Sequence, residues 1–177
     1  MRRATFYLLA AAVVGLDQLT KAWAADALAG GREIPVIPGY LVLSLVHNRG
    51  SAFGMFQGGA VALAVVALFA IGLIVYIEHR GLSGWAVRTA VALQLGGAVG
   101  NLIDRVRFQY VIDFIELDWK GRNIWPVFNL ADMAITAGTA ILVLWLLRTD
   151  GGAPDVVTTP PPSAPLPHGE RKADTHE

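Results

Sequence analysis

The chain has 177 residues, 54% of them hydrophobic and only 16% charged, with a mean hydropathy of +0.50. A soluble domain carries about 25% charged residues, so this composition indicates a membrane protein, and the length allows one domain. The zero net charge gives no indication of a nucleic-acid partner, and the absence of cysteine excludes disulfides, thiolate metal sites and cysteine nucleophiles.

Four segments are long and apolar enough to cross a bilayer, which takes about 20 mainly apolar residues each. They run over Ala4–Ala25, Ala60–Ile77, Trp85–Ile103 and Leu130–Leu147. The basic, apolar N-terminus also resembles a cleaved signal peptide. However, Asp17, Gln18 and Lys21 interrupt this segment where a cleaved signal stays apolar. A retained first helix with buried polar groups is the better interpretation.

Two of the connections between these segments are predicted to contain β-strands. Residues 41–48 (LVLSLVHN) follow the first span and have a strand pattern. Residues 105–114 (RVRFQYVIDF) follow the third and are also predicted as strand, with a turn-rich loop at residues 119–126 (WKGRNIWP). Because two spans separate these connections, both lie on the same side of the membrane. We therefore expect an α-helical integral membrane protein with four transmembrane helices and a small extracytoplasmic β-sheet.

The predicted domain is the membrane-embedded region of residues 1–148, and residues 149–177 form a Pro-rich tail that is expected to be disordered. The 14 Lys and Arg residues divide evenly between the two sides of this topology. Only the basic start, Arg2 and Arg3, favours a cytoplasmic N-terminus, and four spans then place both termini in the cytoplasm.

Five polar clusters are predicted to face the same side of the membrane. They are DQLTK (17–21), HNRGSAF (47–53), GGAVGNLIDR (96–105), VIDF (111–114) and FNLAD (128–132). Polar groups that converge from separate segments indicate a single site. No metal site is predicted, because the four histidines do not cluster at ligand spacing and HExxH is absent.

Asp113 and Asp132 are the strongest candidates for chemistry. A carboxylate beside hydrocarbon is costly to keep ionised, so such residues are functional candidates by default. Asp113 interrupts an apolar strand pattern, whereas Glu116 and Asp118 have the pattern of an exposed edge. Asp132 has an alternative role as the third residue of a helix capped by Asn129. Two carboxylates that share one proton would form the dyad of an aspartyl hydrolase.

The other clusters allow structural as well as functional interpretations. Asp17 and Lys21 share a helix face, either as a self-neutralising pair or as a brace beneath a site. Asn101 and Arg105 also share a face, although Asp104 and Arg105 have an alternative as an interfacial charge pair. The glycines of the third cluster have the GxxxG spacing of closely packed helices. A small transporter or channel with an intramembrane Asp/Arg site, or a membrane scaffold, is the rival interpretation.

Taken in this order and spacing, the five clusters resemble those of the bacterial lipoprotein signal peptidases (signal peptidase II), over about residues 4–147. The resemblance implies an aspartic endopeptidase of the inner membrane that removes signal peptides from prolipoproteins. Cleavage precedes a cysteine that already carries diacylglycerol, and no cofactor is required. The resemblance also implies a periplasmic β-cradle and a flexible periplasmic loop or helix, which match the two β-like connections.

On this resemblance Asp113 and Asp132 match the catalytic dyad, and Asp17 and Lys21 match a structural polar pair. The residues that match the polar surroundings of the dyad are Asn48, Gly50, Asn101, Arg105 and Asn129. The expected partners are the diacylglyceryl-prolipoprotein substrate and membrane lipid, with no nucleic acid. A monomer is expected, with an active site near the periplasmic face and sensitivity to globomycin-type inhibitors.

Overall fold

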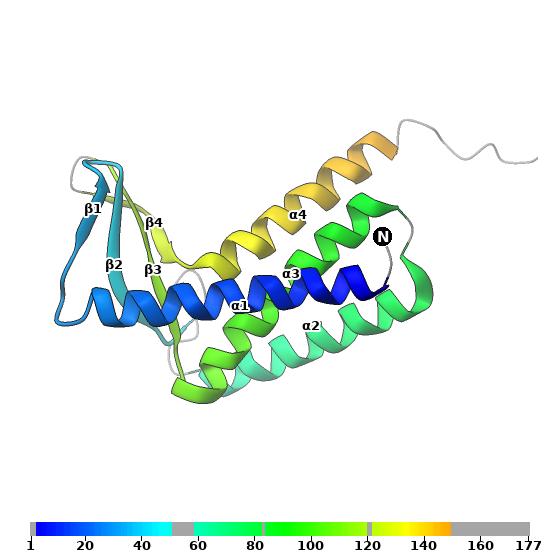
Figure 1. The fold of residues 1–177 in the computed structure, drawn as a ribbon, viewed down its shortest axis with the longest axis horizontal. Coiled ribbons are helices and arrows are strands. Elements are labelled where there is room, and N and C mark those ends of the chain that lie inside the picture. The colour runs from blue at the N-terminus through cyan, green and yellow to red at the C-terminus, as the bar shows by residue number, and fades with distance from the viewer. Residues whose placement is uncertain (1–2, 51–58, 83, 120–121, 150–177) are drawn as a thin grey trace, which may run out of the picture.

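The computed structural model describes residues 3–50, 59–82, 84–119 and 122–149. The elements in chain order are α1 (Arg3–Ala27), β1 (Ile34–Ile37), β2 (Leu41–Asn48), α2 (Ala60–Gly81), α3 (Trp85–Phe108), β3 (Val111–Asp118), β4 (Asn123–Phe128) and α4 (Leu130–Thr149). The sheet lies at one end of the helices, and the start of α1 and the end of α4 lie at the other (Figure 1). Outside the described residues lie 150–177 of the predicted tail, and 51–58 and 120–121 of the connections expected to hold the flexible periplasmic segment.

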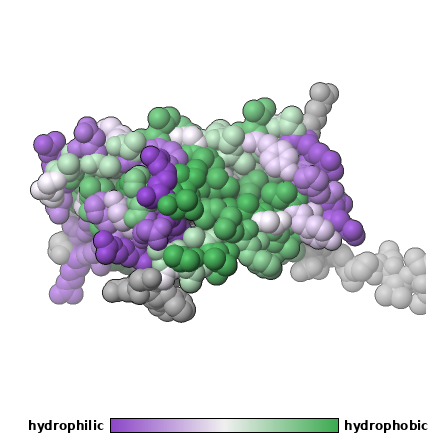
Figure 2. Space-filling view, turned by 90° about the horizontal axis from the view of Figure 1, so that it is seen from below, coloured by the Kyte–Doolittle hydropathy of each residue, from purple (hydrophilic) through white to green (hydrophobic). Residues whose placement is uncertain are grey.

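Three helices in the described part of the chain are long and apolar enough to cross a membrane, over Ala60–Gly81, Trp85–Phe108 and Leu130–Arg148. Helix α1 has a similar length, but its second half carries Asp17, Gln18 and Lys21. On the face shown in Figure 2, hydrophobic residues form a belt between two hydrophilic ends. This is the surface expected of helices surrounded by lipid.

Helix α3 is central to the bundle and packs against α1, α2 and α4. Its glycines allow this, as the GxxxG spacing predicts. A Cβ added to Gly96 would lie 2.6 Å from Cβ of Val13 on α1, and one added to Gly97 would overlap the carbonyl oxygen of Ala131 on α4. The close approach of three helices therefore depends on residues without side chains.

The sheet has the order β1-β2-β3-β4, and each neighbouring pair is antiparallel. The strand predicted over residues 41–48 is confirmed as β2. The strand predicted over residues 105–114 is wrong in its first part, because α3 continues to Phe108. Gln109 then ends the helix in a left-handed conformation with φ of 64°, its N–H bonded to the carbonyl oxygen of Arg105. The strand starts only at Val111.

The loop predicted over residues 119–126 is also wrong in its second half, where β4 begins at Asn123. Pro126 is compatible with a strand here because β4 lies at the edge of the sheet. The prediction that Glu116 and Asp118 lie on an exposed edge is also wrong. Strand β3 is paired on both sides, and the Ser44 hydroxyl donates to Oε2 of Glu116 at 2.5 Å.

Candidate active site

Asp113 and Asp132 reach the same cavity from different elements. Asp113 lies on β3 and is 1% exposed, while Asp132 lies in the first turn of α4. The cavity has a volume of about 290 Å³ and lies where the sheet meets the helices. Asn48, Asn101 and Arg105 also line it. The structure therefore brings together side chains from β2, α3, β3 and α4 that the sequence placed in separate clusters.

Asn129 joins the two carboxylates. Its Nδ2 donates to Oδ1 of Asp113 at 2.6 Å, and its backbone N–H donates to Oδ2 of Asp132 at 3.3 Å. In return, its Oδ1 accepts the backbone N–H of Asp132 at 3.0 Å. The last two bonds form a capping box at the start of α4. The predicted cap is thus confirmed, and the same side chain holds Asp113.

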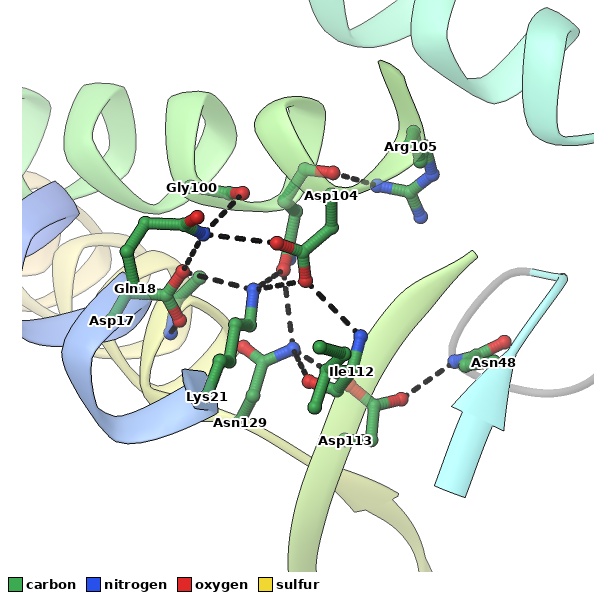
Figure 3. Close-up of polar contacts among 12 residues, drawn as sticks. Asp17, Gln18, Lys21, Asn48, Gly100, Asp104, Arg105, Ile112, Asp113 and Asn129 are labelled. Atoms are coloured by element: carbon green, nitrogen blue, oxygen red, sulfur yellow. Dashed lines mark hydrogen bonds and ion pairs between the residues drawn. The ribbon is translucent and has the colours of Figure 1, made fainter. Parts of the chain in front are cut away.

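Asn48 holds Asp113 from the opposite side, as Figure 3 shows. Its Nδ2 donates to Oδ2 of Asp113 at 2.8 Å. The backbone N–H of Gly50 donates to Oδ1 of Asn48 at 3.0 Å, which fixes the orientation of this amide. Gly50 therefore acts on the site indirectly, through Asn48.

Asn101 holds Asp132 in the same way, with Nδ2 donating to Oδ1 of the carboxylate at 2.8 Å. Its own Oδ1 accepts from Nζ of Lys21 at 2.9 Å and from Nδ2 of Asn129 at 3.1 Å. Arg105 lines the cavity, with Nη1 3.4 Å from the carbonyl oxygen of Asn101. Among the described residues its guanidinium has no ion-pair partner, so it can bind a carbonyl of a ligand.

A buried ion cluster supports these residues from α1. Nζ of Lys21 lies 2.9 Å from Oδ2 of Asp17 and 3.0 Å from Oδ2 of Asp104, and all three side chains are at most 2% exposed. Oδ1 of Asp17 accepts the backbone N–H of Ala131, and Oδ2 of Asp104 accepts that of Ile112 (Figure 3). The cluster therefore ties α1 to the starts of α4 and β3. The alternative prediction of an interfacial Asp104–Arg105 ion pair is wrong, because Asp104 forms its ion pair with Lys21.

The sequence analysis assigned no site contacts to two further polar residues, Gln18 and Glu78. Nε2 of Gln18 donates to Oδ1 of Asp104 at 2.9 Å and to the Gly100 carbonyl at 3.3 Å. Glu78 is fully buried near the end of α2, where Nη2 of Arg88 lies 2.7 Å from Oε1. Its position directly after an uncharged apolar run was the available indication.

Burial raises the pKa of Asp113 from its ordinary value of 3.8 to about 7. The negative charge of Asp132 raises this pKa as well, while the amide bonds from Asn48 and Asn129 lower it. A carboxyl group with this pKa can both hold and release a proton at neutral pH. Paired with a second carboxylate in one cavity, it has the arrangement of an acid–base dyad. Among the described residues, no group of three or more His, Asp or Glu is placed to hold a metal.

Comparisons with known proteins agree on one family. The sequence model of the family described as "Signal peptidase (SPase) II" matches residues 9–148. The lipoprotein signal peptidase of Moorella thermoacetica is 43% identical over 147 residues, which is 82% of this chain and 95% of the relative. That of Clostridium novyi is 42% identical over 135 residues, or 75% of this chain and 90% of the relative. A solved structure of a bacterial membrane enzyme, 30% identical, superimposes with a TM-score of 0.79 over 86% of this chain and 93% of its own.

Proposed function

Because this chain belongs to the signal peptidase II family, we infer that it is a lipoprotein signal peptidase of a bacterial membrane. Such an enzyme removes the signal peptide from lipoprotein precursors. We further propose that it is an aspartic endopeptidase whose dyad is Asp113 and Asp132. The observation that carries this proposal is that Asn129 holds both carboxylates at the wall of one cavity.

In the proposed mechanism Asp113 is protonated and Asp132 is ionised, because two close carboxylates do not both ionise cheaply. The N-terminus of α4 favours a negative charge at Asp132. Asp132 takes a proton from a water molecule, whose oxygen attacks the scissile carbonyl carbon. The O–H of Asp113 donates to the carbonyl oxygen as negative charge develops there. Asp132 then gives the proton that it took from water to the nitrogen of the leaving amine as the peptide bond breaks. Asp113 keeps its own proton when the carbonyl re-forms, so the dyad returns to its starting state, and the mechanism uses no metal or cofactor.

The surrounding polar residues have positioning roles in this mechanism. Asn48 and Asn101 each orient one carboxylate through a bond of 2.8 Å. Arg105 binds a backbone carbonyl of the substrate beside the scissile bond. Asp17 and Lys21 act from beneath, as a brace that fixes the start of α4. Correct placement of reacting groups accounts for a large part of enzymatic rate enhancement.

We propose that α1 is the fourth transmembrane helix, since its polar side chains at Asp17 and Lys21 are buried inside the bundle. Both termini are then cytoplasmic, and the sheet and dyad lie near the periplasmic face. This is supported by the position of both helix ends opposite the sheet (Figure 1). The proposed peptidase domain is residues 1–148, acting as a monomer on diacylglyceryl-modified precursors and inhibited by globomycin-type compounds. The tail from residue 149 has no catalytic role.

The proposal is tested with Asp113→Asn and Asp132→Asn, which keep the size of each side chain and remove the charge. Each variant is expected to insert normally and to lose cleavage of a purified diacylglyceryl-modified precursor, since neither dyad can then activate water. Asp118→Asn, on the same strand but outside the cavity lining, is the matched control and stays active. Near-normal turnover in either dyad variant would contradict the proposal.

The rival function is a small transporter with an intramembrane Asp/Arg site. Among the described residues, the Asp17–Lys21 cluster and the amides around Asp132 lie toward the sheet end of the helices, and the Glu78–Arg88 pair is a separate ion pair at the other end. These groups do not form one polar path through the bilayer. Measuring ion flux and peptide cleavage in the same proteoliposomes separates the two functions. Cleavage without flux is expected.

A further inference from the structure

A row of aromatic rings that ends in an arginine lies at the sheet end of the helices. The ring centroids of His47 and Tyr110 are 4.4 Å apart, and those of Tyr110 and Phe108 are 5.7 Å apart and stacked. The guanidinium carbon of Arg107 lies over the Phe108 ring, 4.9 Å from its centroid. This row of four side chains, the cationic ledge, joins the last turn of α3 to the end of β2.

The cationic ledge is continuous with the rim of the catalytic cavity. Asn48 and Val111 lie opposite each other on β2 and β3, and both line the cavity. Their neighbours in the chain are His47 and Tyr110, the two middle residues of the ledge. A peptide that leaves the cavity past this pair of strands therefore meets the ledge within a few residues of the scissile bond.

The arginines around this rim have no acidic partners. Arg49, Arg105 and Arg107 form no ion pair with any residue that the structure describes. Residues 51–58, which follow Arg49 closely in the chain, contain no Asp or Glu. The proposed dyad carries one negative charge, so the three arginines leave a net positive charge at the rim. Charge of one sign beside a cleft attracts ligands of the opposite sign.

The two outer arginines are accessible to such a ligand. Arg49 and Arg107 are exposed, whereas Arg105 is half-buried in the lining of the cavity. The contact with the Phe108 ring holds the guanidinium of Arg107 in place without neutralising it. A ligand that binds there therefore has to order less of the arginine side chain than it would with a free one.

We propose that the cationic ledge, together with Arg49, binds acidic residues of the precursor that directly follow the lipid-modified cysteine. This rests on the proposed function, in which the signal peptide lies among the membrane helices and the mature part of the precursor leaves at the sheet end. The ledge lies at that end, so it faces the mature part. Arg107 and Arg49 then determine specificity: precursors with Asp or Glu after the cysteine bind more tightly than those with neutral or basic residues.

The test uses three lipid-modified precursors that differ only in the two residues after the cysteine, which are two Asp, two Asn or two Lys. KM is measured for the purified enzyme in a neutral detergent, at low and at high salt. Wild type should have its lowest KM for the Asp precursor and its highest for the Lys precursor. Because the charges are exposed, the difference should shrink at high salt.

The variant Arg107→Gln removes the charge from the ledge. An exposed ion pair corresponds to roughly a one-and-a-half- to fivefold change in binding, so KM for the Asp precursor should rise by that factor. The KM for the Asn precursor and kcat for both should be unchanged, because the contact is the same in the ground and transition states. Arg122→Gln is the matched control, since Arg122 is also exposed but lies between β3 and β4, outside the ledge and the cavity lining.

Three results would overturn the proposal while leaving the peptidase function intact. One is an equal KM of wild type for the Asp and Asn precursors. Another is a rise in KM for all three precursors alike in Arg107→Gln, as expected of a contact with a lipid headgroup or of a structural role. The third is an equal rise in Arg122→Gln, which would reflect net charge alone. If the wild-type enzyme cleaves none of the precursors, the proposed function itself fails.

Discussion

The pKa of Asp113 leads to a prediction about the pH profile of cleavage. The proposed mechanism needs Asp113 protonated, so activity should decline as pH rises through its pKa of about 7. The amide of Asn48 donates to Oδ2 of Asp113 at 2.8 Å, and this bond lowers the pKa because it favours the charged form. In Asn48→Ala that effect is lost, and the alkaline limb of the profile should move to higher pH.

The size of this shift follows from the bond that is removed. Hydrogen bonds to charged groups contribute about 1.5–3 kcal/mol, and one pKa unit corresponds to about 1.36 kcal/mol. Asp113 is 1% exposed, so water cannot replace the missing donor at full strength. The alkaline limb is therefore expected to move upward by roughly one to two pH units.

The assay is kcat/KM of the purified enzyme on a diacylglyceryl-modified precursor between about pH 5.5 and pH 9.5, a range chosen to bracket the pKa. Ser44→Ala is the control, because Ser44 lies on the same strand but donates to Glu116 instead of a dyad residue. Its alkaline limb should coincide with that of wild type. A limb in Asn48→Ala that stays in place or moves to lower pH would refute the reasoning, whatever the change in maximal rate.

Three other predictions concern helix packing, a buried carboxylate away from the site and the C-terminal tail. In Gly100→Ala the new Cβ would lie 2.5 Å from Oδ2 of Asp17, so the variant should lose about 1–3 kcal/mol of stability and part of its cleavage activity. Gly15→Ala is the control, because a Cβ added there would have nothing within 4 Å, and it should lose neither stability nor activity. Glu78→Gln leaves the partly buried Arg88 without its countercharge and should lower stability by about 1–3 kcal/mol, measured by thermal unfolding in detergent, while the folded enzyme still cleaves. A chain truncated after Arg148 should retain wild-type kcat/KM, and an inactive truncation would show that the tail has a role.

Much of the fold could be predicted because its determinants are local. The apolar segments are set by composition, and the shared side of the five clusters follows from the number of crossings between them. The end of α3 could not be predicted in this way. Residues Arg105 to Phe108 have a strand-like composition, but they form the exposed last turn of α3, and the left-handed residue that ends the helix is Gln109 instead of glycine.

The sequence predicted that the polar residues meet at one site, but not which of them contact one another. Asp104 is adjacent to Arg105 in sequence, yet its partner is Lys21 on another helix. Successive residues on a helix point in different directions, so a neighbour in sequence is a poor guide to a partner. For the same reason the sequence indicated that Gln18 is buried but not its partners, which are Asp104 and the Gly100 carbonyl on α3. Only the packing of α1 against α3 determines which of these groups meet.

The start of α4 is the place where the stability of the helix and the proposed chemistry depend on the same atoms. The first N–H groups of a helix have no partner within it, and here two of them are satisfied by side chains of the site. Oδ1 of Asp17 accepts the N–H of Ala131, and Oδ1 of Asn129 accepts that of Asp132. The contacts that fix the helix start therefore also fix the carboxylate of Asp132 and, through Nδ2 of Asn129, that of Asp113. A substitution that removes the Asp17 carboxylate is therefore expected to disturb the proposed dyad through the Ala131 N–H, at the start of α4.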